Sequence, residues 1–423
     1  MKRSKQEEGV APRHGAWLVG ASLALAVLAA PRSQQVRVTL TDGALVHGVL
    51  RGLVGEAREA GLELDLGEAG TRRLPLARVL AVHGAPPEPA GDVLAHLVGG
   101  DEIRGALAGG DAAGESFTLQ SRSLGTVIVP VDRLQTLLFP ARAAGRGPAE
   151  FALPEGSEAD EALFRPTARG FDVVVGAIHR FTPSGVLFEG SVGAEPRQFP
   201  YRDLGAVALR DGLPREAAAD VHLVTRSGDA LRLALRGLDG GMLRGVAEAE
   251  RELEVPLSEI AALTLQRADR VYLSDLEPER VEEAGHAFGD DALPLYRYAE
   301  DRAATGGFLV AGGMPFGKGL GVHSRCSLTY RVPEGCDRFL AWVAIDDAVL
   351  ETPVRGSAEV RVAPAGGAVA FGPKTVRSGA APAAVGPLAV TPGALLTLHV
   401  EFGEGWFVGD RVDWLQAVFL AAR

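Results

Sequence analysis

The sequence predicts an all-β protein, and its composition and its alternating pattern carry this prediction. The chain of 423 residues contains 54 glycines and 26 prolines but only three methionines, a balance that favours turn-rich β-structure over helical bundles. From residue 36 onward, short segments of alternating apolar and polar residues follow one another between polar turns. A chain of this length is too long for one compact core, so we expect several domains.

The charge balance is acidic, with a formal net charge of −11 at pH 7. Proteins that bind nucleic acids need clustered cations to displace the counterions of the phosphate backbone. No basic cluster stands out in the sequence, so we expect no nucleic-acid partner. Only four of the 43 basic residues are lysine, a bias typical of bacteria with GC-rich genomes.

The N-terminus has the pattern of a signal peptide or a signal anchor. Four basic residues within residues 1–14 precede an uncharged apolar run at residues 15–30. This run is shorter than the about 20 residues that a spanning helix usually needs. Small residues near its end suit a signal peptidase, but Pro31 is a poor residue to follow a cut, so a cleaved signal and an uncleaved anchor helix both stay open for residues 1–35.

An export signal of either kind sets the expected location. We expect the periplasm, the cell surface, or anchorage in the inner membrane with the C-terminal domains outside the cytoplasm. The protein would contact a membrane only through an uncleaved anchor.

A short motif recurs four times upstream of residue 266. Each copy reads hydrophobic-Pro-hydrophobic-x-x-aliphatic, and the four prolines are Pro75, Pro130, Pro200 and Pro256. Because proline presets φ, the motif predicts a short helical turn that leads into a last strand. The expected units are residues 36–84, 91–140, 170–211 (degenerate) and 219–266. A Pro/Gly/Ala/Glu-rich stretch at 141–169 reads as a linker that divides the array into two successive pairs.

The units resemble the Sm-like and SH3-like small β-barrels. Upstream of the proline motif lie alternating strands joined by polar turns such as Asp42-Gly43 and Ser227-Gly228, and the third unit lacks this turn. Barrels of this size often bind peptides or RNA. The acidic balance and the lack of exposed aromatic pairs favour a spacer or a self-association role here.

The C-terminal region predicts an antiparallel β-sandwich. Ser327–Val332 and Arg338–Ala344 alternate around a Pro-Glu-Gly turn and are expected to pair as a hairpin, and Leu395–Val400 is a further strand. Two cysteines, Cys326 and Cys336, exclude a disulfide framework. They are either one bridge or two small buried apolar residues.

Five motifs follow one another in this region: Tyr272–Leu276, Phe316–His323, Asp337–Phe339, Ile345–Asp347 and the closing Asp410-x-x-Asp413-Trp414-x-x-Ala417. In this order they resemble the NPCBM family, the novel putative carbohydrate-binding modules. The resemblance covers residues 270–423 and implies a galactose-binding-like jelly-roll β-sandwich. It also implies a galactose-type glycan as ligand and, in some members, a structural calcium. The chain departs from the family's usual residues at Ser324, Arg411 and Val412.

The glycine-flanked segment 403–410 contains the best candidate sugar platform, Trp406. Sugar recognition usually needs an exposed aromatic ring with polar groups around it. Trp406 could instead cap the end of the sandwich. The other candidates are two acceptors, two donors and a histidine for which a core or hairpin-stabilising role is favoured: Glu404, Asp410, Lys318, Arg355 and His323.

Two adjacent acids, Asp346 and Asp347, are the candidate calcium ligands. Their carboxylates suit calcium or sugar hydroxyls, and they could equally hold a turn by accepting backbone N–H groups. No other cofactor is expected.

No catalytic set is visible in the sequence, so we expect no enzyme. The nine histidines are scattered, no zinc-ligand spacing occurs, and Gly317–Gly321 leads into a strand rather than the helix of a phosphate loop. The expected function is that of an exported, non-catalytic glycan-binding protein of the bacterial cell envelope. The alternative is a structural or protein-interaction scaffold that binds envelope proteins and no sugar.

Overall fold

The computed structural model describes residues 34–54, 60–154, 160–190, 195–210, 219–247, 251–284 and 296–421. All regular structure in these ranges consists of β-strands and short 3-10 helices, which confirms the all-β prediction. The expected signal or anchor helix falls before residue 34 and lies outside the described residues. Among those residues, no helix meets the length and hydropathy that a membrane crossing requires.

Four units of the same element order form the N-terminal array, and each ends with a 3-10 turn and a last strand. Unit 1 contains β1 (Gln35–Leu40), β2 (Leu45–Val54), β3 (Gly61–Asp65), β4 (Thr71–Pro75), η3 (Leu76–Arg78) and β5 (Val79–His83). Unit 2 contains β6 (Val93–Leu97), β7 (Glu102–Gly110), β8 (Ser116–Ser121), β9 (Gly125–Pro130), η4 (Val131–Arg133) and β10 (Leu134–Leu138). Unit 3 contains β11 (Glu161–Thr167), β12 (Gly170–Thr182), β13 (Gly185–Gly190), β14 (Arg197–Pro200), η7 (Tyr201–Asp203) and β15 (Ala206–Leu209). Unit 4 contains β16 (Val221–Thr225), β17 (Ala230–Asp239), β18 (Met242–Ala247), β19 (Arg251–Pro256), η9 (Leu257–Glu259) and β20 (Ile260–Leu265).

The proline motif forms the predicted turn in every unit. The four prolines have φ between −55° and −63° and each directly precedes a three-residue 3-10 helix. Proline fixes φ near −65°, which suits the entry to such a turn. The prediction of a helical turn leading into a last strand is therefore confirmed.

The expected closed barrels are not formed, and the resemblance to Sm-like and SH3-like barrels is not confirmed. In unit 1 the strands pair in the order β5-β1-β2-β3-β4, and β4 pairs with β3 alone among the described strands. Strand β5 cannot close the ring because its second edge already pairs with β20 of unit 4, with Leu263 opposite Val82. All residues of β5 and β20 are buried, so these strands lie inside one continuous sheet.

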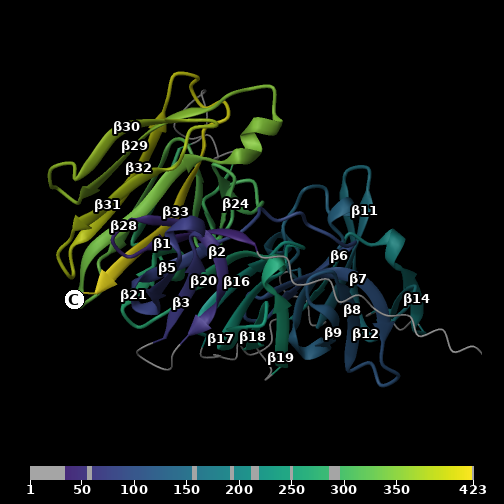
Figure 1. The fold of residues 1–423 in the computed structure, drawn as a ribbon. Coiled ribbons are helices and arrows are strands. Elements are labelled where there is room, and N and C mark those ends of the chain that lie inside the picture. The colour runs from purple at the N-terminus through teal and green to yellow at the C-terminus, as the bar shows by residue number, and fades with distance from the viewer. Residues whose placement is uncertain are drawn as a thin grey trace, which may run out of the picture.

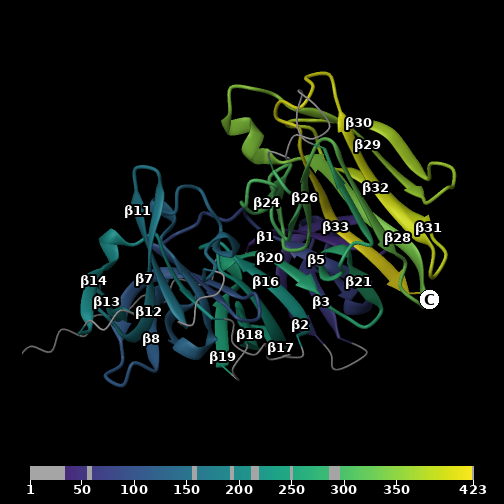
Figure 2. The same ribbon diagram turned by 180° about the vertical axis from the view of Figure 1, so that it is seen from behind.

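The units pair in a nested order rather than as two successive pairs. Unit 1 joins unit 4 through β5 and β20, and unit 2 joins unit 3 through β10 and β15. Units 2 and 4 meet where Glu102 of β7 lies opposite Ala230 of β17. Strand β11 lies within the stretch read as a linker and is the first strand of unit 3. Figures 1 and 2 show units 2 and 3 on one side of units 1 and 4.

Two reciprocal hydrogen bonds hold units 2 and 4 together. The carboxylate of Asp229 accepts from the backbone N–H of Arg104 at 2.8 Å, and that of Asp101 accepts from the N–H of Arg232 at 3.0 Å. The two aspartates occupy the same position after the turn glycine in their units. The contact is therefore two-fold in character, as between two copies of one surface.

Two antiparallel sheets face each other in the C-terminal sandwich. One follows the order β23 (Ala299–Glu300), β26 (Gly319–His323), β33 (Arg411–Ala421), β28 (Cys336–Ile345), β31 (Ala383–Ala389), with β21 (Arg270–Tyr272) also on β33. The other follows β22 (Arg280–Glu283), β27 (Cys326–Arg331), β32 (Leu395–Phe402), β29 (Ser357–Pro364), β30 (Phe371–Arg377). A hairpin of β24 (Leu309–Ala311) and β25 (Met314–Phe316) and the turns η10 (Leu273–Asp275) and η11 (Asp347–Glu351) complete it.

The predicted antiparallel sandwich is confirmed, but the predicted hairpin inside it is wrong. Strand β27 pairs with β32 and β22, whereas β28 pairs with β33 and β31, so the turn at 333–335 carries the chain from one sheet to the other. Alternation alone does not show which strand is the partner, and here both strands bury one face in the same core. Cys326 and Cys336 are free and buried, as two small apolar residues.

The outer face of the six-stranded sheet is also apolar, and it packs on the array. A cluster joins Leu80 of unit 1 to the hairpin and to this face, with Phe316, Trp342, Leu415 and Val418 among its members. Polar contacts surround it. Tyr272 donates its hydroxyl to Leu265 O at 3.0 Å, Thr39 donates to Gln416 Oε1 at 2.8 Å, and Arg270 donates to the carbonyls of Val79 and Ala77. The array and the sandwich therefore form one packed body (Figure 1).

We predict that Leu80→Ala lowers the free energy of unfolding by about 2–5 kcal/mol. The side chain is fully buried between the two parts, so its loss removes apolar contacts and leaves a cavity. Urea denaturation measures the change. The matched control is Val281→Ala, whose side chain is 40% exposed and should cost under about 0.5 kcal/mol. Equal small effects of both variants would contradict the packing of the array on the sandwich.

Candidate functional site

Trp406 lies on an exposed loop at one end of the sandwich. The loop runs from β32 to β33, and a single β-bridge between Gly403 and Trp406 closes it. The tryptophan is 68% exposed and has φ of +59°, a left-handed conformation that costs a non-glycine residue about 1–2 kcal/mol. Such strain at an exposed aromatic residue points to a functional constraint on that position.

The ring of Trp406 continues a row of aromatic and cationic groups. Its centroid lies 6.5 Å from that of Phe402, with an interplanar angle of 31°. The guanidinium of Arg325 lies over the Phe402 ring at 5.9 Å and pairs with Glu401 at 3.5 Å. The row offers an apolar face flanked by a hydrogen-bond donor, the combination that a sugar ring requires.

Glu404 and Arg355 flank the same loop. Glu404 is exposed and forms an ion pair with Arg377, and its backbone N–H donates to Ser357 Oγ at 2.8 Å. Arg355 is exposed, and its guanidinium donates to the carbonyls of Thr352 and Val354 at 2.9 and 3.1 Å. The carbonyl oxygen of Arg355 lies 4.0 Å from where a Cβ on Gly405 would be, so the two segments are neighbours. The structure therefore brings these two candidates together with Trp406.

A close glycine contact fixes this arrangement. A Cβ on Gly356 would lie 1.7 Å from the carbonyl oxygen of Gly409, so a side chain at 356 would force the two segments apart. Residue 355 and the end of the 403–410 loop can be neighbours only because position 356 has no side chain.

Asp410 and His323 lie beneath the loop rather than on its surface. Both side chains are buried, at 0% and 6% exposure, and Asp410 Oδ1 lies 3.4 Å from His323 Nε2. The Ser324 hydroxyl donates to Asp410 Oδ2, and His323 Nδ1 lies 2.9 Å from the Ser324 carbonyl. Burial raises the pKa of Asp410 to about 7. These groups support the loop and are not exposed to a ligand.

The serine, histidine and aspartate at this position do not form a hydrolytic triad. In such a triad the imidazole lies between the hydroxyl and the carboxylate and takes the proton from the hydroxyl. Here the carboxylate lies between, because Ser324 donates directly to Asp410. Ser324 is 1% exposed, so no substrate reaches its hydroxyl.

Asp346 and Asp347 hold a turn and the β24–β25 hairpin. Asp346 accepts from Ala348 N at 2.9 Å and Val310 N at 3.3 Å, and Asp347 accepts from the N–H groups of Gly312 and Gly313 at 3.2 and 2.8 Å. All four carboxylate oxygens therefore already accept N–H groups. Among the described residues, no three His, Cys, Asp or Glu side chains gather as metal ligands do. The pair does not fit a calcium site, which needs six to eight oxygen ligands.

A second buried acid, Asp413, lies beside Asp346. Asp413 is fully buried, and burial, with the neighbouring Asp346, raises its pKa well above the usual range. Burial also raises the pKa of Asp346. Two adjacent buried carboxyls share a proton more readily than they both ionise. Asp346 and Asp413 are therefore part of the sandwich interior.

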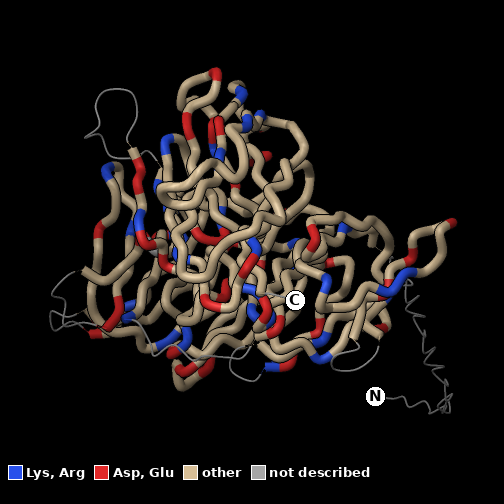
Figure 3. Tube along the Cα trace, turned by 90° about the vertical axis from the view of Figure 1, so that its left-hand side faces the viewer, with Lys and Arg blue, Asp and Glu red and all other residues tan. Residues whose placement is uncertain are grey.

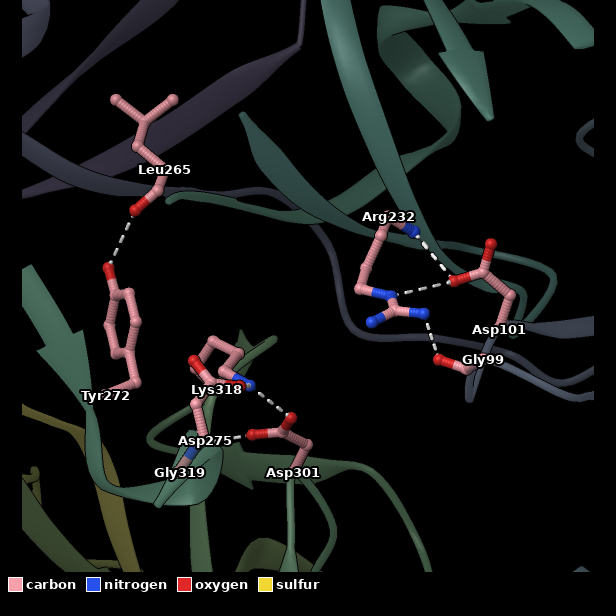
Figure 4. Close-up of polar contacts among 9 residues, drawn as sticks. All are labelled: Gly99, Asp101, Arg232, Leu265, Tyr272, Asp275, Asp301, Lys318 and Gly319. Atoms are coloured by element: carbon pink, nitrogen blue, oxygen red, sulfur yellow. Dashed lines mark hydrogen bonds and ion pairs between the residues drawn. The ribbon is translucent and has the colours of Figure 1, made fainter. Parts of the chain in front are cut away.

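Lys318 is not brought together with the other candidates. It lies at the opposite end of β26 from His323, about 16 Å away at the usual strand rise of about 3.3 Å per residue. Lys318 is buried, with 3% of the residue exposed, and its ammonium lies 2.6 Å from carboxylate oxygens of both Asp275 and Asp301 (Figure 4). Burial alone would lower its pKa, but the two carboxylates outweigh burial and the pKa is raised. Lys318 is a structural cation beside the array.

The structure adds residues that the sequence did not single out as site residues. Phe402 and Arg325 extend the row from Trp406. Arg411 lies over the Tyr296 ring at 5.5 Å, and that ring lies 5.5 Å from the His323 ring. Arg411 had one sequence signal, its departure from the family's usual residue. The other three had none, because their role depends on strands far apart in the chain.

Residues 269–420 match the NPCBM/NEW2 domain family. The resemblance of the C-terminal region to this family is confirmed. Among curated proteins none matches the chain.

The chain is also similar to solved carbohydrate-binding modules. A CBM51 module of Clostridium perfringens GH95, in complex with methyl-galactose, is 20% identical, with 36% of this chain and 99% of that chain covered and a TM-score of 0.30. The tandem CBM51 modules of a Streptococcus pneumoniae family 98 glycoside hydrolase are 13% identical, covering 92% and 88%, with a TM-score of 0.30. The CBM51-2 and INT domains of Clostridium perfringens ZmpB, with GlcNAc, are 19% identical, covering 48% of this chain and 40% of that chain, with a TM-score of 0.31.

We predict that Asp410 makes the sandwich less stable as the pH rises from 4 to 7. The folded-state pKa of about 7 lies above the ordinary value of 3.8, so folding favours the neutral carboxyl. This contribution is fully present below about pH 4 and is lost as the pH rises through 7. It amounts to as much as about 4 kcal/mol.

The Asp410→Asn variant separates this effect from other titrations, because the amide oxygen still accepts from Ser324 but does not ionise. Urea denaturation of both proteins at pH 4, 5.5 and 7 should show a steeper fall for the wild type. Identical pH profiles would contradict the assignment.

Proposed function

We propose that this protein is an exported, non-catalytic glycan-binding protein that holds carbohydrate on the sandwich end bearing Trp406. The observation that carries this proposal is the exposed, left-handed tryptophan at the head of an aromatic row, within a region that matches the NPCBM/NEW2 domain family. An exposed tryptophan offers a large apolar face together with an N–H donor, a combination that is enriched at binding surfaces.

The neighbouring polar groups support binding of sugar hydroxyls. Arg325 and Arg355 can donate to ring or hydroxyl oxygens, and Glu404 can accept from hydroxyls. Arg355 has exposed N–H groups beyond its two backbone contacts. In this proposal His323 and Asp410 act only as supports, and Lys318 takes no part.

The proposal includes a galactose-type ligand, because the family implies one and a similar module was solved with methyl-galactose. It includes no catalytic role, because the buried Ser324, His323 and Asp410 are arranged as a structural support. The proposal that the protein is exported is based on the apolar N-terminal run at residues 15–30.

We predict that Trp406→Ala weakens glycan binding at least about tenfold. Loss of the ring removes the apolar surface that a pyranose covers, and tenfold corresponds to about 1.4 kcal/mol. A glycan array screened with the full chain identifies the ligand, and calorimetry then measures Kd for both proteins. Val408→Ala is the control, since this exposed side chain is in the same loop but off the aromatic row, and it should change Kd less than twofold. No binding to any glycan at millimolar ligand would overturn the proposal.

We predict that calcium does not stabilise the protein. The oxygens of Asp346 and Asp347 are already engaged, so 1 mM calcium or a chelator should shift Tm by less than about 1 °C. Asp347→Ala, by contrast, removes two hydrogen bonds that hold the β24–β25 turn and should cost about 1–2 kcal/mol with or without calcium. A calcium-dependent rise in Tm that this variant abolishes would show that the pair does bind the ion.

A second function, as a protein-interaction scaffold, is favoured by the open sheet edges of the array. Strands β4, β9, β14 and β19 each pair on one side only among the described strands. Unpaired edges are the surfaces to which extended peptides add. The two functions use different parts of the molecule and do not exclude each other.

A further inference from the structure

A cavity of about 140 Å³ lies between units 2 and 4. Apolar side chains from both units line it, including Leu97, Ile103 and Val129 from unit 2 and Leu231, Ala247 and Leu253 from unit 4. An apolar cavity of about 150 Å³ in a protein interior holds a benzene molecule. This cavity therefore has room for one side chain of the size of leucine or phenylalanine. It opens to the surface beside Ile128, which is 61% exposed.

Among the described residues, one cation of the cavity wall, Arg251, has no acidic partner. Arg251 lines the cavity and is partly buried, and its guanidinium makes one hydrogen bond in the described structure, to Thr126 O at 3.4 Å. Arg244 on the adjacent strand instead pairs with Asp239 and Glu254. The acid in the lining, Asp101, already accepts from the Arg232 N–H. A partly buried guanidinium without an anion is costly, so a carboxylate placed here would be stabilised.

An unpaired strand edge borders the same cavity. Among the described strands, β9 pairs only with β8 and β19 only with β18. Val131 N bonds to Glu115 O on the β8 side, and Thr126 O points the other way, to Arg251. Because residues two apart in a strand share a side, the N–H and C=O of Ile128 also face away from β8, beside the cavity. Pro130, the next residue on that side, has no N–H to satisfy.

We propose that this cavity binds the C-terminal residue of an extended polypeptide. The apolar side chain of that residue enters the cavity, its terminal carboxylate pairs with Arg251, and its main chain adds to the edge of β9 through Ile128. Each part of the ligand meets one of the three features, which together are the elements of strand addition with carboxylate capture. Strand β33 is paired on both edges inside the sandwich, so it is not the occupant, and the proposal commits to a second polypeptide.

Fluorescence polarisation with the full chain tests the proposal. The probes are fluorescein-labelled hexapeptide pools whose last residue is fixed as Leu, Phe, Val or Asp and whose other positions are randomised, each made as the free acid and as the amide. We expect the apolar free-acid pools to bind at least about tenfold more tightly than the Asp pool and than their own amides. Equal binding of acids and amides, or binding of no pool, would overturn the proposal.

Three variants locate the site. Arg251→Gln should weaken the apolar free-acid pools about tenfold and leave the amides unchanged, and Ala247→Phe should block the cavity. Arg244→Gln is the matched control, since the side chain of this arginine is 43% exposed and lies outside the cavity, and it should bind like the wild type. An unchanged Kd in Arg251→Gln would refute the role of the guanidinium. Hexanoate binding as tightly as the peptides, with the same dependence on Arg251, would assign the cavity to small organic acids and overturn the polypeptide occupant.

Discussion

The arrangement of the molecule depends on a sheet that is apolar on both faces. The six-stranded sheet buries one face in the sandwich core and the other against Leu80, the β24–β25 hairpin and the hydrogen bonds of Arg270. A sheet of this kind cannot stand with one face in water, because each large apolar side chain left exposed would forfeit about 1.5–3 kcal/mol. Covering it fixes the sandwich on unit 1 and leaves the loop that carries Trp406 away from the junction, open to solvent.

The need to cover apolar strands also determines how the units of the array pair. The last strands β5, β10, β15 and β20 are buried almost throughout, and each has neighbours on both edges. Pairing these strands between units buries them without closed barrels. Among the described strands, it leaves β4, β9, β14 and β19 each with one unpaired edge. The distribution of charge does not indicate which units pair, because acidic and basic residues are interspersed along the chain (Figure 3).

Local features of the fold could be predicted from the sequence, and long-range pairing could not. The turn after Pro75 and its counterparts follows from the fixed φ of proline, and the sandwich follows from alternation. The partner of β27 depends on which strand shares its edge, and no residue between 327 and 344 encodes that choice. At the site, the flanking glycines marked Trp406 as a candidate, but the sequence left open whether its ring is exposed or caps the sandwich. The burial of Lys318 was not expected, because Asp275 and Asp301 come from other segments of the chain.

The nested pairing of the units determines which contacts would carry a mechanical force across the molecule. Gln34, at the start of the described chain, donates to the carbonyl of Ile260 in unit 4, and unit 1 packs directly on the sandwich. A force applied between the chain's start and a ligand on the Trp406 loop would pass through units 1 and 4 and the Leu80 junction. Units 2 and 3 lie outside this path as long as the pairing of β5 with β20 and the Leu80 junction hold.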